Sequence, residues 1–455
     1  MIPTDNPQIQ LAFDFVQYTG KNIFLTGKAG TGKTTFLKNL KQLSPKRMVV
    51  VAPTGVAAIN AGGVTIHSFF QLPFSPFIPK EKSGASEWDE TPAPQMQSQA
   101  FKFSREKVNI MKSLDLLVID EVSMVRADIL DAIDEVLRRY KNRFLPFGGV
   151  QLLMIGDLQQ LPPVVKEEEW QLLKNYYQTM FFFGSLALQK TDYVSIELKH
   201  IYRQSDPVFI DLLNRIRDNN ADMQTIKKLH ERYIPDFSPD KEKGYITLTT
   251  HNAQALQINQ EKLAKLSQKQ FTFKAKVKGD FPEFAYPTEF DLVLKTGAQV
   301  MFIKNDVSYE KLFYNGKIGT VERFEDELIF VRCENEADLI AVSPAEWKNM
   351  KYTINDETKE ITEEEIGSFI QYPLKLAWAI TIHKSQGLTF EKAIIDANSA
   401  FAHGQVYVAL SRCKSLEGLV LSSTIQQRGI ISDKLVNNFN HRSEEHTSEL
   451  QSRQV

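Results

Sequence analysis

The segment Gly27–Thr34, GKAGTGKT, has the residues best suited to bind a polyphosphate. It fits G-x-x-x-x-G-K-[ST], in which glycines let backbone N–H groups curl around phosphates and the next helix adds partial positive charge. Lys33 would reach the β- and γ-phosphates, and Thr34 would ligate Mg²⁺. A Gly-rich turn can match by chance, but an apolar strand pattern precedes this one and a helical pattern follows. The predicted ATP contacts are Gly27, Ala29, Gly30, Thr31, Gly32, Lys33, Thr34 and Thr35.

Asp120 and Glu121 end an apolar run and provide the carboxylates that ATP hydrolysis needs beside the phosphate-binding loop. Ligands of α/β proteins bind at the carboxyl ends of strands. Asp120 would hold the Mg²⁺ shell, and Glu121 would orient and deprotonate the attacking water. Acidic pairs also commonly cap the next helix, so the prediction depends on the phosphate-binding loop nearby.

Alternating strands and helices must position these residues, so we expect the α/β class with parallel sheets. Each strand predicted in the first half is a near-continuous apolar run, typical of strands that helices cover on both faces. These strands are Asn22–Thr26, Met48–Ala52, Leu114–Asp120 and Gln151–Ile155.

Apolar strands for a second α/β domain are predicted at Tyr193–Leu198, Tyr245–Thr249, Lys392–Asp396 and Gly418–Ser422. Between about 273 and 371, residues alternate in β fashion, as in Gln299–Ile303 and Leu328–Cys333, with Asn315-Gly316 as a tight-turn signal. We interpret this section as a small inserted β-barrel. The proline-rich stretch from His67 to about Phe103 predicts an irregular insert in the first domain.

The length of 455 residues is too great for one compact core, so we expect two large domains. The first covers residues 1–185 with an inserted wedge at about 64–110, and the second covers 186–441 with its insert at 273–371. Residues 442–455 form a probable non-native tail, because Arg442–Ser452 resembles a translated sequencing adapter.

Net charge, cysteine content and the lack of long apolar segments limit the classes of protein to which the chain can belong. The net charge is −2 and the isoelectric point is near 6.5, so there is no overall basic field, although a local basic groove stays compatible with this balance. Cys333 and Cys413 are the only cysteines, which predicts neither a disulfide framework nor a metal cluster. The sequence shows no signal peptide and no apolar run of about 20 residues, so we expect a cytoplasmic protein without a membrane segment.

Further motifs narrow the function of the nucleotide site. They are Ala52–Ala58 (APTGVAA), Thr65–Phe70 (TIHSFF), Gly156–Val164 (GDLQQLPPV), Ala379–Gly387 (AITIHKSQG) and Val406–Arg412 (VYVALSR). In this order they resemble the motifs of superfamily-one helicases. Ile129–Gly149 resembles the signature sequence of the petite-integration-frequency (PIF) DNA helicases, relatives of RecD, and the resemblance runs from about Gln8 to about Leu421.

The resemblance implies two RecA-like P-loop domains with an SH3-like β-barrel insert in the second. It implies an ATP-driven, Mg²⁺-dependent DNA helicase that moves 5′-to-3′ on single-stranded DNA and unwinds forked duplexes. Replication, recombination and repair are the implied processes, G-quadruplexes and RNA–DNA hybrids are further candidate substrates, and a monomeric motor is expected.

The same resemblance implies roles for single residues. Gln160 would sense the γ-phosphate, and Arg203 and Arg412 would be arginine fingers from the second domain, although arginines outside such motifs usually form surface salt bridges. Gly387 joins the predicted nucleotide contacts. An N-terminal glutamine would recognise adenine; Gln8 and Gln10 are both candidates, and Gln10 is our choice.

A DNA track is implied along both domains, where hydroxyls, amides and a lysine would hold phosphates without reading sequence. Its residues are Pro53, Thr54, Gly55, Ala57, His67, Ser68, Thr250, Asn252, His383 and Lys384. Thr250 and Asn252 have an alternative role as caps of a turn. Phe69, Phe70, Phe74 and Phe77 could form a strand-separating wedge or belong to the core.

Two other functions compete with this interpretation. A P-loop ATPase that remodels proteins or drives transport would keep the phosphate-binding loop, and its turnover would not respond to DNA. A non-catalytic DNA-binding protein would need a degenerate site, whereas Lys33, Glu121 and Arg412 are all present.

Overall fold

A computed structural model gives the structure of the chain. It describes residues 6–79, 103–235, 237, 244–306, 308, 310–334, 336, 338–355, 357–396, 403–426 and 433–441. The predicted tail 442–455 and the middle of the predicted wedge, residues 80–102, lie outside the described residues.

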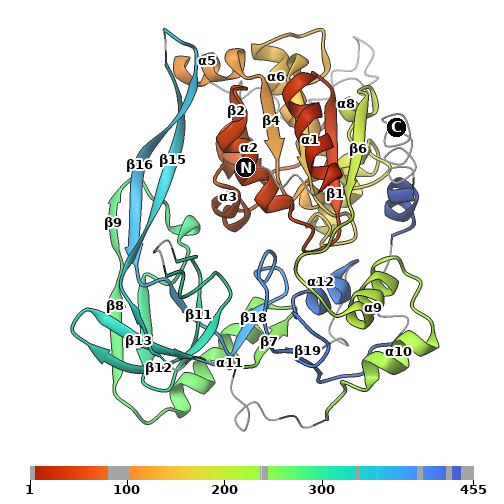
Figure 1. Ribbon diagram of the computed structural model, residues 1–455. Helices are drawn as coiled ribbons and strands as arrows, with labels where there is room; N and C mark the ends of the chain where they lie inside the picture. Colours follow the sequence, from red (N-terminus) through yellow and green to blue (C-terminus); the bar gives the residue numbers. More distant parts are fainter. Residues whose placement is uncertain are drawn as a thin grey trace.

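Six parallel strands form the first sheet, in the order β3-β2-β4-β5-β1-β6 (Figure 1). Their bounds are β1 Asn22–Gly27, β2 Met48–Ala52, β3 Val64–Thr65, β4 Leu116–Ile119, β5 Gln151–Ile155 and β6 Tyr193–Leu198. Neighbouring residues within a strand belong to different cores: Phe24 packs in one cluster, and Ile23 and Leu25 pack in another. Both faces of the sheet are therefore covered, which explains the continuous apolar runs.

Most helices of this half begin at a short polar side chain that accepts hydrogen bonds from their first N–H groups. For example, the Asn6 side chain accepts from the N–H groups of Gln8 and Ile9 at the start of α1. The bounds are α1 Pro7–Tyr18, α2 Lys33–Leu43, α3 Gly55–Ala61, α4 Ile66–Phe70, α5 Arg105–Ser113, α6 Ala127–Tyr140, α7 Glu167–Leu173 and α8 Leu186–Gln189. The signature Ile129–Gly149 forms most of α6 and the short 3-10 helix Pro146–Gly149.

Two segments predicted for the second domain pack on the first. β6 pairs with β1 along its whole length, so the assignment of Tyr193–Leu198 to the second sheet was wrong. Residues 433–441 also return to the first core, where Val436 is fully buried and Phe439 stacks on Phe183 with ring centroids 4.4 Å apart. Apolar runs mark strands and helices but do not specify the sheet that receives them.

The second sheet is also parallel, in the order β18-β7-β19-β20. Its strands are β7 Ile246–Thr249, β18 Ala379–Thr381, β19 Ala393–Ile395 and β20 Leu419–Leu421. The helices of this half are α9 Pro207–Arg217, α10 Met223–His230, α11 Asn252–Lys265 and α12 Gln405–Ser411. The prediction of a second parallel α/β unit is confirmed, with β18 as a strand that the sequence pattern missed.

Antiparallel strands lie between β7 and β18 in the sequence, with their own core around Val300, Ile329 and Leu374. They are β8 Gln270–Lys274, β9 Lys276–Gly279, β10 Asp291–Lys295, β11 Gln299–Phe302, β12 Ile318–Glu325, β13 Leu328–Cys333, β14 Ile340–Val342, β15 Ala345–Ile354, β16 Ile361–Gln371 and β17 Leu374–Leu376. We call this unit the β insert. The β15–β16 hairpin extends to the first domain (Figure 1), where the N–H of Val50 donates to the Tyr352 hydroxyl at 3.0 Å.

The wedge interpretation is wrong for two of its four phenylalanines. Phe69 and Phe70 are buried in α4 and belong to the core of the first domain, and Phe77 packs partly against the same core. Phe74 is 83% exposed and stacks on His67 with ring centroids 4.9 Å apart. Only Phe74 keeps the exposure that stacking on a base would require.

Among the described residues, no helix is both long enough and apolar enough to cross a membrane.

Candidate functional site

The phosphate-binding loop joins β1 to α2, as predicted, and three of its glycines have positive φ. Gly27, Gly30 and Gly32 have φ of +152°, +84° and +90°, a region that other residues rarely adopt. A Cβ on Gly30 would lie 2.5 Å from the Cβ of Arg203, so this position also needs glycine for space. The spacing of the motif thus reflects backbone geometry as well as phosphate binding.

Lys33 begins α2 and is half-buried. Its ammonium donates to the carbonyl oxygens of Gly27 and, at 3.0 Å, of Lys28. Burial lowers the pKa of Lys33, although Asp157 and Glu121 act in the opposite direction. The amine is held among the loop carbonyls at the floor of a cavity of about 500 Å³.

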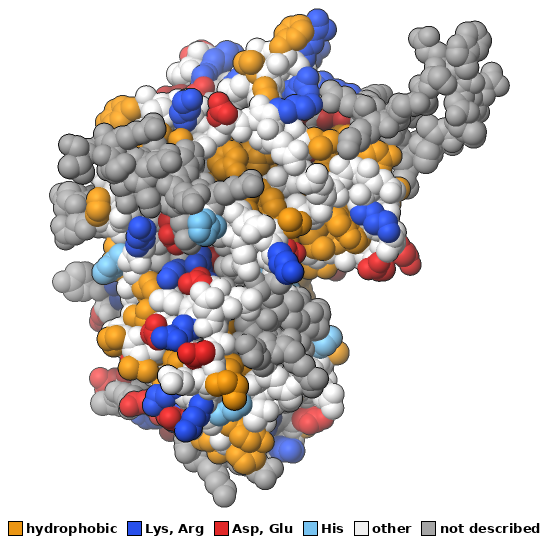
Figure 2. Space-filling model, turned by 90° about the vertical axis from the view of Figure 1, so that its right-hand side faces the viewer, with side chains coloured by type: hydrophobic (Ala, Val, Ile, Leu, Met, Phe, Trp, Pro, Cys, Tyr) orange, Lys and Arg blue, Asp and Glu red, His pale blue; other side chains and the backbone are white. Residues whose placement is uncertain are grey.

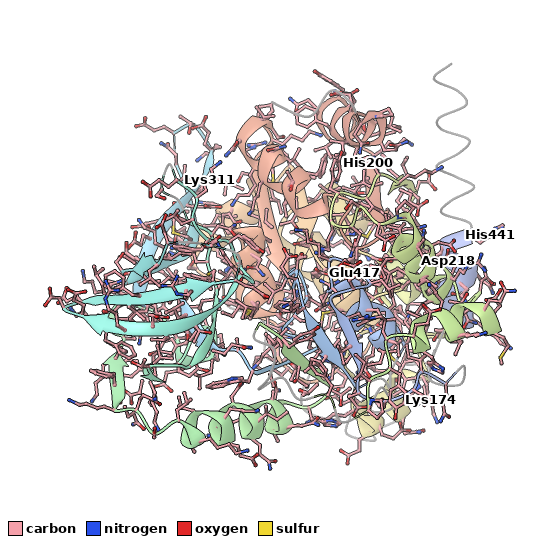
Figure 3. The ribbon with its side chains drawn as sticks, turned by 60° about the horizontal axis from the view of Figure 1, so that its bottom comes forward. Lys174, His200, Asp218, Lys311, Glu417 and His441 are labelled. Carbon is pink, nitrogen blue, oxygen red and sulfur yellow. The ribbon has the colours of Figure 1, made fainter. Side chains whose placement is uncertain are left out.

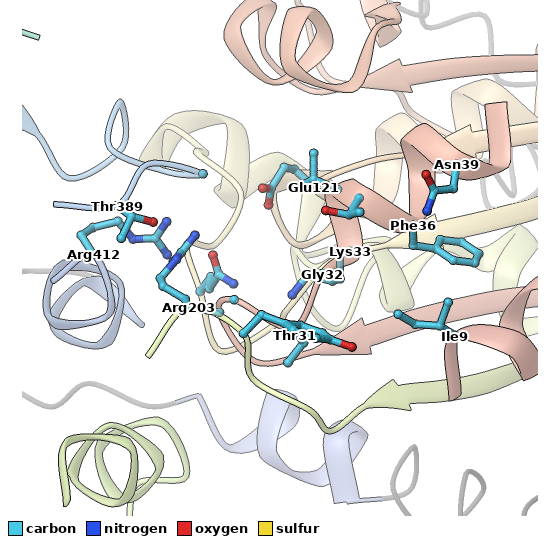
Figure 4. A pocket seen from close by; sticks show the side chains of 17 residues that line it. Ile9, Thr31, Gly32, Lys33, Phe36, Asn39, Glu121, Arg203, Thr389 and Arg412 are labelled. Carbon is cyan, nitrogen blue, oxygen red and sulfur yellow. The ribbon is translucent and has the colours of Figure 1, made fainter. Parts of the chain in front are cut away.

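This cavity lies between the two domains, and both contribute to its lining (Figure 4). Most of the residues predicted to contact the nucleotide take part in it. They are Ala29, Gly30, Thr31, Gly32, Lys33, Thr34, Thr35, Glu121, Gln160, Arg203, Gly387 and Arg412. Gly27 contributes its carbonyl to Lys33 and lies outside the lining.

Arg203 and Arg412 reach the cavity from the side opposite Lys33 and Glu121 (Figure 4). Arg412, which follows α12, is 1% exposed, and its guanidinium donates to the Val408 carbonyl at 3.0 Å. Burial and the neighbouring Arg203 lower the pKa of Arg412. Neither arginine forms a salt bridge with a described residue, so the alternative of a surface salt bridge does not hold for them.

The origin of Arg203 differs from our expectation. It lies in the segment 199–206 that connects β6 of the first sheet to α9, rather than in the second domain itself. The N–H of Tyr202 donates to the Gly30 carbonyl at 2.8 Å, and Arg203 donates to the Ser411 carbonyl at 3.3 Å. This connector is therefore held by both domains next to the phosphate-binding loop.

Asp120 and Glu121 follow β4 directly, at the carboxyl end of the sheet. Burial and the neighbouring Glu121 raise the pKa of Asp120 to about 7, and burial raises the pKa of Glu121. Asp120 and the Thr34 hydroxyl line one cavity, so an oxygen donor set of the kind that Mg²⁺ prefers is present. The residues fit a magnesium ion bound together with a nucleotide.

Gln160 is held in the cavity by a buried ion pair that sequence reasoning missed. Its amide donates to Asp157 at 3.2 Å, and Asp157 pairs with Arg217 of α9 at 3.3 Å. The Arg217 cation and Lys33 hold the pKa of Asp157 below its usual range in spite of burial. Asp157 stands in the GDLQQ motif and could have been noticed there, whereas no local pattern points to Arg217.

α12 makes a second contact between the domains that we did not predict. The N–H of Ala29 donates to the Tyr407 hydroxyl at 3.0 Å. Gly404, just before α12, has φ of +73°, and a Cβ there would lie 2.3 Å from the Gln160 carbonyl. The VYVALSR motif therefore packs on both the phosphate-binding loop and the GDLQQ segment.

Neither Gln10, our choice for recognising adenine, nor the alternative Gln8 lines the cavity. Gln10 is exposed, and its amide donates to Asp14 one helical turn away, at 2.8 Å. Ile9 lines the cavity instead, because successive residues of a helix point about 100° apart. Ile9, Phe36 and Asn39 form the end of the cavity farthest from the arginines (Figure 4), and Tyr202 also lines it.

A second cavity adjoins the first and contains part of the predicted DNA track. Thr54, Ala57 and His383 line it together with Asp120, and Asn305 and Asn315 of the β insert close it. Thr34, Glu121 and Gly387 line both cavities, so the two spaces share walls. Burial lowers the pKa of His383, which favours its neutral form.

The other residues of the predicted track do not line this cavity. Thr250 is 6% exposed and bonds to the His251 ring at 2.8 Å, so little of its side chain is accessible to DNA in this structure. Asn252 is exposed at the start of α11, where it caps nothing, because the cap position is His251. The remaining members, Pro53, Gly55, His67, Ser68 and Lys384, are exposed or half-buried.

Comparison with known proteins agrees with this geometry. A family model described as PIF1-like helicase matches residues 9–226. The human ATP-dependent DNA helicase PIF1 is 34% identical over 433 residues, which cover 92% of this chain and 61% of the human protein. The Campylobacter jejuni ATP-dependent DNA helicase Pif1 is 33% identical, with 89% of each chain covered.

A solved structure is similar over nearly the whole chain. Pif1 from Bacteroides sp in complex with ADP-AlF4 is 43% identical, covers 98% of each chain and superimposes with a TM-score of 0.88. The chain spans about six tenths of the length of the human relative. On the evidence of these sequence and structural matches, the chain belongs to the PIF1-like helicase family.

Proposed function

We propose that this chain is an ATP-driven DNA helicase that translocates on single-stranded DNA. The observation that carries the proposal is the composition of the interdomain cavity, with Lys33 and Glu121 on one wall and Arg412 on the other. One domain supplies the phosphate-binding loop and the other supplies a buried cation, so the site is complete only when both domains meet. The names of the relatives and a Bacteroides Pif1 structure bound to ssDNA support this function.

ATP and Mg²⁺ are the proposed cofactors, with Thr34 and Asp120 as the metal-holding residues. The metal ion, when bound, would neutralise phosphate charge. Lys33 then exchanges its bonds with the loop carbonyls for the phosphates, and Glu121 orients a water for attack. Arg203 and Arg412 stabilise the charge that develops on the transferred phosphoryl group, an effect typically of about 10³–10⁵ in rate. Gln160, fixed by Asp157, senses the γ-phosphate.

Coupling between nucleotide and DNA is proposed to pass through the shared walls of the two cavities. Thr34, Glu121 and Gly387 line both, so a change at the phosphates alters the space beside Thr54 and His383. The grip on DNA would come from Pro53, Thr54, Gly55, Ala57, His67 and Ser68 on one domain and Asn252, His383 and Lys384 on the other. Alternating grip would turn each hydrolysis cycle into a step along the strand.

The finer properties follow from family membership and stay proposals. They are 5′-to-3′ movement, action on forked duplexes, G-quadruplexes or RNA–DNA hybrids, a role in replication, recombination or repair, a monomeric motor and a cytoplasmic location. We also propose that the β insert contains an SH3-like barrel, since β10–β14 and β17 enclose a core of their own around Val300, Ile329 and Leu374.

The test is ATP turnover with and without single-stranded DNA, together with unwinding of duplexes that carry either a 5′ or a 3′ tail. We expect DNA to stimulate turnover, unwinding only from the 5′ tail, and loss of both activities in Lys33→Ala. Turnover that ignores DNA would favour a protein-remodelling ATPase. Wild-type activity of Lys33→Ala would contradict the catalytic assignment.

A further inference from the structure

A lysine-rich stretch at one margin of the molecule plays no part in the site described above. Residues 262–279 contain six lysines and no acidic residue, in a chain whose net charge is −2. The stretch begins in the last turn of α11 and continues through β8 and β9. Figure 3 shows α11, the pale green helix at the bottom of the view, along one edge of the molecule, and no residue of α11 lines the nucleotide cavity.

The backbone of β8 and β9 sorts these side chains onto one face. Phe271 and Phe273 point inward, where both rings pack against Phe324, and Ala275 is buried. Successive residues of a strand alternate between faces. The outward positions are therefore 270, 272, 274, 276 and 278, and Lys274, Lys276 and Lys278 occupy the last three in succession. We call these three residues the lysine row.

Asp291 is the cross-strand partner of Lys274, whereas the partners of Lys276 and Lys278 are Ile370 and Ser368, so most of the lysine row has no carboxylate opposite it. All three side chains are exposed and form no ion pair with a described carboxylate. The lower half of the face in Figure 2, on the far side of the molecule from β8 and β9, differs: there Lys and Arg side chains lie beside Asp and Glu. A run of unpaired cations favours an anionic partner.

The spacing of the lysine row suits a phosphodiester backbone. Alternate residues of a β-strand lie about 6.6 Å apart, and each strand of a duplex carries one phosphate per about 3.4 Å of helix axis, so cations and phosphates recur on a similar length scale. Long lysine side chains tolerate small mismatches, and they contact phosphates without reading bases. A flat row of this kind can therefore hold a nucleic acid of any sequence.

The lysine row is also connected to the proposed DNA track. α11 begins at Asn252, a residue of that track, and ends at Lys265. Its 14 residues span about 21 Å, and Lys262, Lys265 and Lys269 continue the positive charge from its last turn to β8. Nucleic acid leaving the track over the second domain can follow α11 to the lysine row.

We infer that the lysine row binds the phosphodiester backbone of nucleic acid outside the motor track and extends the DNA footprint of the protein. The inference rests on the proposed function, because it assumes that DNA crosses the second domain at Asn252. The source of the phosphates is either the single strand leaving the track or a duplex arm beside it.

Salt dependence of binding tests the inference. The variants are K274Q/K276Q/K278Q, a charge-preserving K274R/K276R/K278R, and K166Q/K227Q/K434Q, which removes three exposed lysines elsewhere. Fluorescence anisotropy would measure affinity across salt concentrations for oligo-dT of about 8 nucleotides, within the common site sizes of about 4–16, and of about 30 nucleotides, well beyond them. A blunt duplex serves as the third probe.

We expect K274Q/K276Q/K278Q to reduce the slope of log affinity against log salt by about 2 on the long strand, or by about 2.7 on the duplex. The short strand, the arginine variant and the distant lysine variant should keep the wild-type slope. The probe whose slope changes identifies the source of the phosphates. Unchanged slopes on both long strand and duplex would overturn the inference and leave these lysines as protection of a strand edge.

The two proposals can fail separately. Wild-type slopes in the glutamine variant, together with DNA-stimulated turnover that Lys33→Ala abolishes, would remove the lysine row and keep the helicase. A reduced slope in K274Q/K276Q/K278Q, together with ATP turnover that DNA does not stimulate, would keep the lysine row as a binding surface and remove the helicase.

Discussion

The backbone N–H of Ala29, in the phosphate-binding loop, donates to the hydroxyl of Tyr407, on α12 of the other domain, at 3.0 Å. Both groups are buried, and Ala29 packs within the core of the second domain. The loop that binds phosphate is therefore positioned partly by a residue that follows it by 378 positions.

Tyr407→Phe removes this bond and leaves the Ala29 N–H without its partner. Loss of a buried hydrogen bond costs about 1–3 kcal/mol, so we expect the KM for ATP to rise by about 5- to 100-fold. Steady-state kinetics and binding of a fluorescent ATP analogue would measure the change. Tyr372→Phe is the control, since its hydroxyl donates to the Glu327 carbonyl in the β insert; a similar KM in both variants would contradict this role for Tyr407.

Arg412→Ala should leave nucleotide binding intact and reduce turnover by about 10³–10⁵, because the cation acts on transition-state charge. Equilibrium binding and single-turnover hydrolysis separate the two effects. Arg232→Ala is a matched control, because Arg232 also donates to backbone carbonyls of the second domain but does not line the cavity. Normal turnover of Arg412→Ala would refute the finger assignment.

Glu121→Gln keeps the shape of the side chain but cannot accept the proton of the attacking water. We expect turnover to fall by about 10²–10⁴, the usual contribution of a general base, while ATP and DNA still bind. A stalled complex of the variant with ATP and DNA should be visible by gel shift. The exposed Glu261→Gln should behave as wild type, and an active Glu121→Gln would assign the base to another residue.

Arg217→Met removes one partner of the buried pair with Asp157 and should destabilise the protein by about 3–5 kcal/mol, because a buried charge is left uncompensated. Urea unfolding would measure this loss. Asp157→Asn combined with Arg217→Met should recover part of it, since both charges are then absent. Equal stability of the single and double variants would show that the pair is not coupled.

The pH dependence of stability should differ between wild type and Arg217→Met. In the wild type the pKa of Asp157 is depressed, so its contribution is present above the unfolded pKa of about 3.9 and is lost as the pH falls through the folded pKa. In Arg217→Met, burial without the Arg217 cation should raise that pKa. The variant should then gain stability as the pH falls through the raised pKa towards the unfolded pKa of about 3.9, and urea midpoints at several pH values would detect this opposite sign.

Gly316→Ala tests the contact between the β insert and the nucleotide cavity. Gly316 has φ of +103°, and a Cβ there would lie 3.2 Å from the carbonyl of Thr389, which lines the cavity. We expect a higher KM for ATP along with some loss of stability. Gly297→Ala has a similar strain, with φ of +87°, but its neighbour is Leu266. Gly297→Ala should lose stability without a change in KM. An unchanged KM in Gly316→Ala would show that the contact between Gly316 and Thr389 does not affect ATP binding.

The sequence by itself determined the local chemistry and most of the elements. The phosphate-binding loop, the acidic pair after β4 and the strands β2, β5, β6 and β13 agree with the predictions residue by residue or within two residues. Such features depend on short-range patterns: glycines that permit positive φ, and apolar runs that helices cover on both faces. The order of the family motifs identified the residues that meet in the cavity.

Only the tertiary structure decided which segments meet. β6 and residues 433–441 belong to the first domain, and Phe69 and Phe70 lie in its core. Ile9 lines the nucleotide cavity, where we expected Gln10. The pair of Asp157 and Arg217 joins residues 60 positions apart, and the bond from Ala29 to Tyr407 spans 378. Contacts of this kind depend on how whole elements pack, and that arrangement has no signature in the residues next to either partner.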